Sequence, residues 1–450
     1  MAKLAVNGGK KLRDRKFSYS NFILDEEKKA ALDVLDGGIL SQYLGCSHEN
    51  FYGGKRVQKF EEEWAEYFGV KHAIAVNSAT SGLYCAVGAT GVEVADEIIV
   101  SPYTMSCSAV APLIYNSIPI FADIEKDFFC LDPDSVREKI TSRTKAIIVV
   151  DIFGNPYDAK KINDLAREHN LLVIEDCAQA PGAFYQGKPA GTLGDIGIYS
   201  LNYHKHIHTG EGGVVVTNND TVAEKIRLIR NHAEAVLDGQ RSNDLVNMLG
   251  FNYRMLEIQA AIGSIQLKRL KDLVLERQKN VNYLSNRLSQ IPCLRPMGPR
   301  EGSTHSFYLH PIKFNSEVAS VDRNTFVDAV KAELPFMEKR EKEGVLIESG
   351  YVKPLYLQPL YQSKMAYGSK HFPWSYTQEG MSINYNKGLC PVSELMFEKE
   401  LIVHELIRSG MKQVDLDDVA CAFEKVWNYR EELNGFSIFN RGKNLSTEAF

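Results

Sequence analysis

The feature that most constrains the fold is a regular alternation of strand-like and helix-like segments between residues 57 and 275. The strand-like segments are short, apolar, rich in β-branched residues and bounded by turn residues. They lie at 73–77, 97–102, 118–124, 145–154, 171–178, 196–202 and 212–218. Strands that alternate with helices form a mainly parallel sheet with both faces covered. The chain is therefore predicted to have an α/β fold, with a large domain whose mostly parallel seven-stranded sheet lies between helices.

Helices are predicted between several of these strands, at 81–91, 132–142 and 158–170. Residues 257–290 are read as one long helix or two, which would connect the large domain to a smaller C-terminal α+β domain. In that smaller domain a strand is predicted at 308–314, and helices are predicted around 324–333 and 399–410. The predicted units are residues 1–275, including the N-terminal segment, residues 276–436, and a tail at 437–450.

Composition excludes several classes of protein. The net charge of −5 over 450 residues gives no reason to expect nucleic acid or an anionic membrane as a partner. The longest apolar runs are strand-sized, far from the ~20 residues that span a bilayer, and the N-terminus lacks the apolar segment of a secretory signal. Eight cysteines without paired spacing predict reduced thiols, and hence a cytoplasmic protein.

Polar residues follow the predicted strands, where parallel sheets bind ligands. The segment SATSG at 78–82 leads into a helix, so it predicts either a phosphate site or an ordinary helix cap. Glu175 and Asp176 end an apolar strand, and Gln179 follows. A buried carboxylate needs a cation or hydrogen-bond donors, although an N-cap aspartate is the simpler interpretation of this segment alone.

The segment HKHIHTGEGG at 204–213 raises a choice between metal and amine chemistry. On a strand, His204, His206 and His208 would share one face, but same-face neighbours lie roughly 7 Å apart, so one ion could reach only two of them. No H-E-x-x-H or C-x-x-C supplies further ligands, so no metal is expected. The histidines are expected to pack around the lysine between them, Lys205, or to add positive charge beside it.

Together these segments contain the groups that hold pyridoxal 5′-phosphate (PLP). The aldehyde of this cofactor needs a lysine amine, here Lys205, and its pyridine nitrogen needs a carboxylate, here Asp176. Its phosphate needs the N–H and hydroxyl donors that the segment 78–82 provides. A lysine in water has a pKa near 10.4, so Lys205 needs burial or a neighbouring cation to act as a base at neutral pH.

The sequence resembles the DegT/StrS-type aminotransferases, fold type I PLP enzymes that act largely on keto sugars. The resemblance runs from about residue 25 to 275, and more weakly to about 430. It is carried by the motifs NSATSGL, DEIIVSPYTMSCSA, PIFADIEKDFFCLDP, VIEDCAQAPGA, SLNYHKHIHTGEGG and GFNYRMLEIQAAI. The resemblance implies that Lys205 binds the cofactor aldehyde, Asp176 its pyridine nitrogen, and Gln179 the region of its phenolic oxygen.

The resemblance also implies the remaining site residues. The phosphate is held by Ala79, Thr80, Ser81 and Ser200, and by Asn252 from the other subunit of a homodimer with shared active sites. Substrate contacts are expected from Arg254, His204 and Tyr43. The sequence departs from the family pattern at three places: Met105 replaces an aromatic residue over the cofactor ring, Asp151 replaces a histidine, and the loop 43–54 is longer than usual.

The expected reaction is transfer of an amino group from an amino acid, L-glutamate first, to a keto or aldehyde sugar used for polysaccharide, lipopolysaccharide or amino-sugar synthesis. Nucleotide-linked sugars, sugar acids and cyclic ketones such as an inosose are the candidate acceptors. Some dehydratases of this family carry histidine in place of the lysine, so a PLP-dependent sugar dehydratase is one alternative. The others are a regulatory or scaffold protein that has kept the fold, and a zinc enzyme. The spacing of Lys205 from Gly210 favours the aminotransferase.

Overall fold

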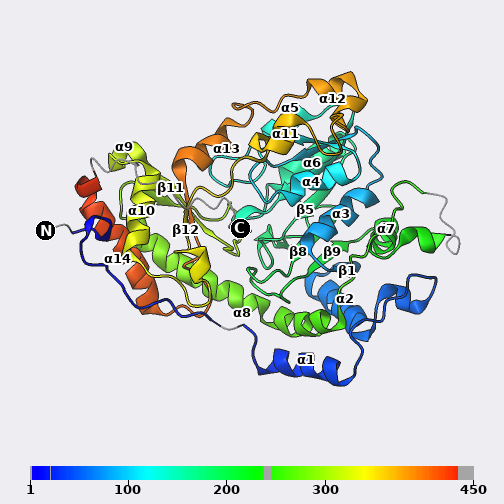
Figure 1. Cartoon of the computed structure of the whole chain (residues 1–450), viewed down its shortest axis with the longest axis horizontal. Helices are drawn as coiled ribbons and strands as arrows, with labels where there is room; N and C mark the ends of the chain where they lie inside the picture. Colours follow the sequence, from blue (N-terminus) through cyan, green and yellow to red (C-terminus); the bar gives the residue numbers. More distant parts are fainter. Residues whose placement is uncertain (1–2, 21, 238–244, 434–450) are drawn as a thin grey trace.

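The computed structural model describes residues 3–20, 22–237 and 245–433 (Figure 1). The predicted tail at 437–450 lies outside the described residues. All seven predicted strands occur and form one sheet in the order β1-β9-β8-β5-β4-β2-β3. They are β1 (His72–Val76), β2 (Glu97–Val100), β3 (Ile118–Phe121), β4 (Thr144–Val150), β5 (Leu172–Asp176), β8 (Ile196–Ser200) and β9 (Gly213–Thr217). The sheet is parallel except for β9, which is antiparallel to both of its neighbours.

Helices cover both faces of this sheet, because successive side chains of each strand point to opposite faces. In β2, Ile98 packs in the core under α3 and α4, whereas the next residue, Ile99, packs in the core under α5 and α6. The helices on the first face are α3 (Ala79–Ala89), α4 (Cys107–Ile114) and α7 (Asp220–Arg230). Those on the second face are α2 (Lys55–Phe68), α5 (Pro133–Lys139), α6 (Ala159–Glu168) and α8 (Glu257–Leu288).

The long segment after the sheet forms one helix of 32 residues, α8. Its N-terminal half packs on α2 and on α1 (Asp25–Asp36), and its C-terminal half packs on α14 (Gln413–Asn428). Figure 1 shows α8 running from beneath the large sheet to the second group of strands and helices. The helix therefore connects the two sheets, as the sequence predicted.

The second sheet is antiparallel, with the order β10-β11-β13-β12. Its strands are β10 (Leu294–Pro296), β11 (His310–Phe314), β12 (Ile347–Ser349) and β13 (Leu401–His404). It packs with α10 (Arg323–Glu333) and α14, and the short helix α9 (Ser316–Ala319) contributes Ala319 to the same core. A separate two-stranded hairpin consists of β6 (Phe184–Tyr185) and β7 (Lys188–Pro189). The predicted helix at 399–410 is wrong. This segment enters the sheet as the central strand β13, because its apolar run is fully buried between β11 and β12.

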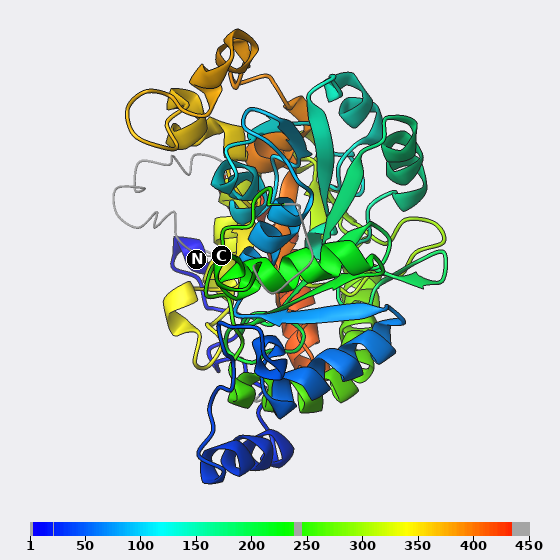
Figure 2. The same ribbon diagram turned by 90° about the vertical axis from the view of Figure 1, so that its right-hand side faces the viewer.

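Two segments cross between the regions around the two sheets. Near the N-terminus, Leu4 and Phe17 are buried in the core of the second sheet. Residues 351–395 cover the large sheet instead, with α11 (Pro359–Ser363), α12 (Gln378–Ser382) and α13 (Pro391–Leu395). Figures 1 and 2 show this segment, in orange, at the opposite end of the molecule from α1. The domain division at residue 275 stays a prediction. Within the described ranges, no helix is long and apolar enough to cross a membrane.

Candidate active site

The first group of predicted site residues lies where β1 ends and α3 begins. Ser78 caps α3, and its Oγ accepts a hydrogen bond from the Ser81 N–H at 3.1 Å. Ala79 and Thr80 form the first turn of the helix, where backbone N–H groups point outward and attract anions. The helix cap and the phosphate site, which were alternative predictions for this segment, are compatible. The Ser78 side chain binds one N–H group and leaves the first turn of the helix open.

The strand β9 approaches this helix end very closely. A Cβ atom added at Gly213 would lie 2.6 Å from the backbone nitrogen of Ala79. Real Cβ atoms are never found this close to another heavy atom, so glycine at this position lets the strand and the helix N-terminus pack together. The position of the first turn of α3 therefore depends on Gly213.

Asp176 is the last residue of β5, and its carboxylate is buried, since the residue is 4% exposed. Its Oδ2 accepts a hydrogen bond from the Ser108 hydroxyl at 2.9 Å, and its Oδ1 accepts one from the Ala178 N–H at 3.2 Å. Burial raises the pKa of this carboxyl, while the Ser108 and Ala178 hydrogen bonds and the charge of Lys205 act in the opposite direction. A cationic group bound against Asp176 would stabilise the ionised form further.

Lys205 lies in a turn that follows β8, and its N–H donates to the Asn202 carbonyl at 2.9 Å. Its Nζ is 4.2 Å from the centroid of the Tyr308 ring, a cation–π contact with a residue just before β11. Burial lowers the pKa of Lys205 to about 8, against the opposing charges of Asp176 and Cys107. The amine is therefore neutral at a much lower pH than a lysine in water.

Cys107 and Ser108, at the start of α4, lie between these groups and were not predicted as site residues. The pKa of the Cys107 thiol is raised to about 11, mainly by burial and also by the charge of Asp176, while a hydrogen bond with Thr80 acts in the opposite direction. Thr80, Asp176 and Lys205 thus all act on one side chain, although they are far apart in the sequence. The signal for both residues was the segment CSA after β2, which was read only as part of a family motif.

Gln179 is held on both sides of its amide. Its Oε1 accepts a hydrogen bond from the Phe153 N–H at 2.7 Å, and its Nε2 donates to the Tyr351 hydroxyl at 2.9 Å. Tyr351 begins the segment that covers the large sheet, and its ring packs against Phe153 and Tyr103. Ser200, at the end of β8, is also buried, and its Oγ accepts from the Asn202 N–H at 3.3 Å.

The three histidines do not form a strand face, because residues 204–207 are turns and bends and residue 208 has no regular structure. His204 Nδ1 lies 3.2 Å from a guanidinium nitrogen of Arg340, while His206 Nε2 lies 2.9 Å from the Ser306 carbonyl. Burial is the main cause that lowers the pKa of all three imidazoles, to about 4 for His204. Among the residues that the structure describes, no group of three or more histidine, cysteine or acidic side chains is arranged to hold a metal ion.

The remaining predicted residues lie in different surroundings. Met105 is 37% exposed, and Tyr43 is buried, with its ring 5.1 Å from the Arg230 guanidinium. Asn252 is exposed, and its Oδ1 accepts a hydrogen bond from Arg254 Nε at 2.7 Å. Arg254 also forms a backbone bridge with Val76 at the end of β1, which brings this segment to the edge of the sheet where α3 begins.

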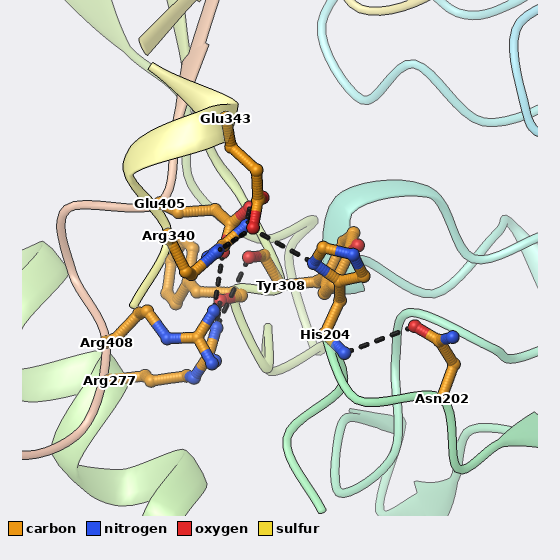
Figure 3. Close-up of polar contacts among 9 residues, drawn as sticks. Asn202, His204, Arg277, Tyr308, Arg340, Glu343, Glu405 and Arg408 are labelled. Atoms are coloured by element: carbon orange, nitrogen blue, oxygen red, sulfur yellow. Dashed lines mark hydrogen bonds and ion pairs between the residues drawn. The ribbon is translucent and has the colours of Figure 1, made fainter. Parts of the chain in front are cut away.

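A cluster of buried charges adjoins His204 (Figure 3), and one member, Glu405, acts electrostatically on Lys205. Glu405, just after β13, binds Arg340 through both carboxylate oxygens, at 2.6 and 3.0 Å, and Arg408 at 2.7 Å. Burial alone would raise the pKa of Glu405, but the hydrogen bond from Arg340 and the charges of Arg408 and Arg340 lower it to about 2. Glu405 is thus ionised throughout the physiological range.

Fold and site together define a class of protein. A mostly parallel seven-stranded sheet with a second, antiparallel sheet, and with a lysine, a buried carboxylate and an open helix N-terminus near its strand ends, is the architecture of fold type I PLP enzymes. The chain matches the model of the DegT/DnrJ/EryC1/StrS aminotransferase family over residues 44–392, and it belongs to this family. It is therefore a PLP-dependent aminotransferase.

Relatives agree with this assignment. The chain is 31% identical to the GDP-perosamine synthase of Vibrio cholerae over 83% of this chain and 94% of that protein. It is 30% identical to the L-glutamine:2-deoxy-scyllo-inosose aminotransferase of Streptomyces lividus over 96% of this chain and 99% of that protein. The structure of an aminotransferase from Psychrobacter cryohalolentis superposes with a TM-score of 0.74 at 27% identity, covering 92% of this chain and 99% of that one.

Proposed function

We propose that this protein transfers an amino group from an amino acid, L-glutamate or its amide, to the carbonyl group of a sugar or a sugar-derived ring, with Lys205 as the catalytic base and acid. The observation that carries the proposal is the proximity of Lys205, Asp176 and the first turn of α3 at one edge of the sheet. These groups suit the three polar parts of PLP: the amine its aldehyde, the carboxylate its pyridine nitrogen, and the helix N-terminus its phosphate.

PLP supplies the electron sink that makes a proton on the substrate Cα acidic. Lys205 Nζ is proposed to take that proton from Cα and would deliver it to the carbon of the cofactor that carried the aldehyde group. Its pKa of about 8 suits both steps, because a group with a pKa near the working pH exchanges protons readily in either direction. The Tyr308 ring, whose centroid is 4.2 Å from Nζ, would attract the amine while it is protonated.

The other site residues are proposed to fix the cofactor. Asp176 keeps the pyridine nitrogen protonated, and Ser108 orients its carboxylate. The Gln179 amide, held by hydrogen bonds with Phe153 and Tyr351, would bind the phenolic oxygen. The phosphate is proposed to bind the Thr80 hydroxyl, together with the remaining donors named from the sequence, which are Ala79, Ser81, Ser200 and Asn252.

The acceptor is proposed to be a keto sugar or a cyclic polyol ketone. Family relatives named as acting on each class match this chain, but the match to the inosose aminotransferase extends over nearly the whole length of both chains. It thus includes residues 351–395, which place Tyr351 against Gln179. A cyclic ketone without a nucleotide is therefore the second candidate, and this coverage is the observation that favours it.

We also propose a homodimer in which Asn252 reaches the partner's cofactor. Large apolar side chains near Asn252 are exposed, Leu249 by 70% and Leu256 by 44%, as at a surface that a second copy covers. The test is to mix Lys205→Ala chains with Asn252→Ala chains. A mixed dimer would contain one intact site and regain part of the activity, whereas sites built from one chain would stay inactive.

The first experiment is the visible spectrum of the purified protein with PLP, before and after L-glutamate or L-glutamine is added. We expect a yellow protein that one of these donors turns colourless, and no such change in Lys205→Ala. A Lys161→Ala protein is the matched control, because Lys161 is exposed on α6. A wild-type spectrum that neither donor changes would contradict the proposal. Acceptors are then screened for an aminated product, and loss of a hydroxyl without amine gain would indicate a dehydratase.

A further inference from the structure

The cluster around Glu405 contains more buried positive charge than negative charge (Figure 3). Arg277, Arg340 and Arg408 are 2%, 4% and 4% exposed. Of the described carboxylates that pair with these arginines, Glu405 is the one buried to the same degree. Glu343, which also pairs with Arg340, keeps 22% of its side chain exposed. Because a buried charge is costly unless it is paired, this excess of arginine over carboxylate points to a missing anion.

The excess positive charge lies on Arg277 and Arg408. Arg340 is bound by Glu405, Glu343 and His204. Among the described residues, Arg408 has one hydrogen-bonded partner, Glu405, and Arg277 Nη1 donates to the carbonyl oxygens of residues 307 and 308, at 3.0 and 3.2 Å. Within the described residues, no carboxylate lies within ion-pair distance of Arg277. Burial and the charge of Arg408 lower the pKa of Arg277 to about 9, although the charge of Glu405 acts in the opposite direction, so the compensation of this buried cation is incomplete.

A pocket of about 290 Å³ opens onto this cluster. Its lining combines aromatic rings with cationic side chains, from Tyr19, Tyr203, His204, Lys339, Arg340 and Arg408. The volume lies at the lower limit for small-molecule sites, which suits an amino acid better than a nucleotide-linked sugar. None of the described residues that line the pocket is acidic.

The pocket lies next to the candidate catalytic amine. His204, which precedes Lys205 in the chain, is part of the lining. Tyr308 joins the two sites, because its carbonyl accepts from Arg277 at 3.2 Å and its ring lies 4.2 Å from Lys205 Nζ. Glu405 also acts electrostatically on both Lys205 and His204.

We propose that this pocket binds a carboxylate of the amino donor, held by Arg408 and Lys339 and stabilised by the field of Arg277. This inference rests on the proposed function and specifies where its donor binds. A guanidinium group suits a carboxylate, since its parallel N–H donors match the two oxygens. Glu405 binds Arg408 through one guanidinium nitrogen, Nη1.

The test uses the PLP-loaded enzyme and the donor concentration that gives half of the maximal rate of colour loss. In Arg408→Gln this concentration should rise about tenfold or more, the loss expected from one charge-assisted hydrogen bond, and by less in Lys339→Gln. Arg287→Gln is the matched control: it removes an arginine of α8 that pairs with Glu424, away from the pocket. Lys339 is exposed, so its variant serves even if Arg408→Gln does not fold.

Three donors identify the carboxylate. If Arg408→Gln weakens the binding of L-glutamate and L-glutamine but not that of the α-amide of glutamate, the pocket binds the α-carboxylate. If the variant weakens the binding of L-glutamate and of the α-amide but not that of L-glutamine, the pocket binds the side-chain carboxylate. Either result supports the proposal. Equal weakening of all three donors, or of none, would overturn it.

A binding measurement separates this proposal from the proposed function. Calorimetry with glutarate, a dicarboxylate without an amino group, requires no turnover. Glutarate that binds the wild type and binds Arg408→Gln more weakly supports the subsite even if no donor changes the spectrum, an outcome that would refute the aminotransfer reaction alone. Tight binding of inorganic phosphate without binding of glutarate would instead assign the pocket to a phosphoanion and overturn the proposal.

Discussion

The substitution Glu405→Gln removes the one fully buried carboxylate of the arginine cluster and keeps its shape. At pH 7, Arg340 and Arg408 would lose their shared ionic partner while all three arginines stay buried. Breaking a buried ion pair by removing one partner costs about 3–5 kcal/mol, because the remaining charge is left uncompensated. We expect a loss of this size in the free energy of unfolding.

The pKa of Glu405 gives a second, independent magnitude. Its lowering from 4.5 to about 2 corresponds to about 3 kcal/mol of stability. Because the pKa is lowered in the folded state, this stability is fully present above pH 4.5 and is lost as the pH falls from 4.5 toward 2. At pH 4, the wild type should already have lost about 1 kcal/mol of this stabilisation. The glutamine variant should lose none of its stability from this position, because glutamine does not titrate.

The assay is urea denaturation of both proteins at several pH values between 7 and 4. The difference in unfolding free energy should be large at pH 7 and should narrow below pH 4.5. Glu398→Gln is the control, since Glu398 is exposed and pairs with the exposed Lys387, a type of pair that contributes about 0–1 kcal/mol. A difference that stays constant with pH, or a Glu405→Gln protein as stable as the wild type, would refute the reasoning.

Three further predictions concern the cofactor site. Ser108→Ala should weaken PLP binding about tenfold, because it removes a hydrogen bond to a buried carboxylate, and equilibrium titration of the apoprotein measures this. Gly213→Ala should weaken PLP binding at least as much, since its Cβ would displace the first turn of α3, whereas Gly298→Ala, with open space around its Cβ, should bind normally. The rate at which the apoprotein takes up PLP should rise with pH and level off above about 8, as Lys205 loses its proton, and a pH-independent rate would contradict the lowered pKa.

The large sheet and its strand-end groups could be predicted from sequence because both depend on local patterns. Runs such as residues 146–150 are apolar and β-branched enough to form buried strands in almost any context. Parallel strands place their carboxyl ends at one edge, so Asp176 and the start of α3 were expected near each other before any contact was known. The order of the elements along the chain was therefore enough to predict which main candidate groups lie near one another.

The contribution of the second sheet could not be predicted in the same way. Tyr308 and Glu405 are more than a hundred residues from Lys205 in the sequence, and only the tertiary fold brings them beside it. The error at 399–410 has the same origin, because a short apolar run fits a helix or a strand equally well until neighbouring strands are known. A signal was present, however: Glu405 directly follows the apolar run LIVH, and a charge so placed needs buried partners.

The residues that the second sheet and its neighbouring segments bring beside Lys205 change what the site can do. Groups from the large sheet alone would give Lys205 an acidic neighbour, Asp176, which raises the pKa of the amine. Burial is what lowers that pKa to about 8, and the Tyr308 ring, which belongs to the second region, covers the amine from one side. The same region supplies Arg340 and Arg408, next to His204. The large sheet therefore provides the groups suited to the cofactor, whereas the region of the second sheet adds the Tyr308 ring beside the lysine and the arginines of the neighbouring pocket.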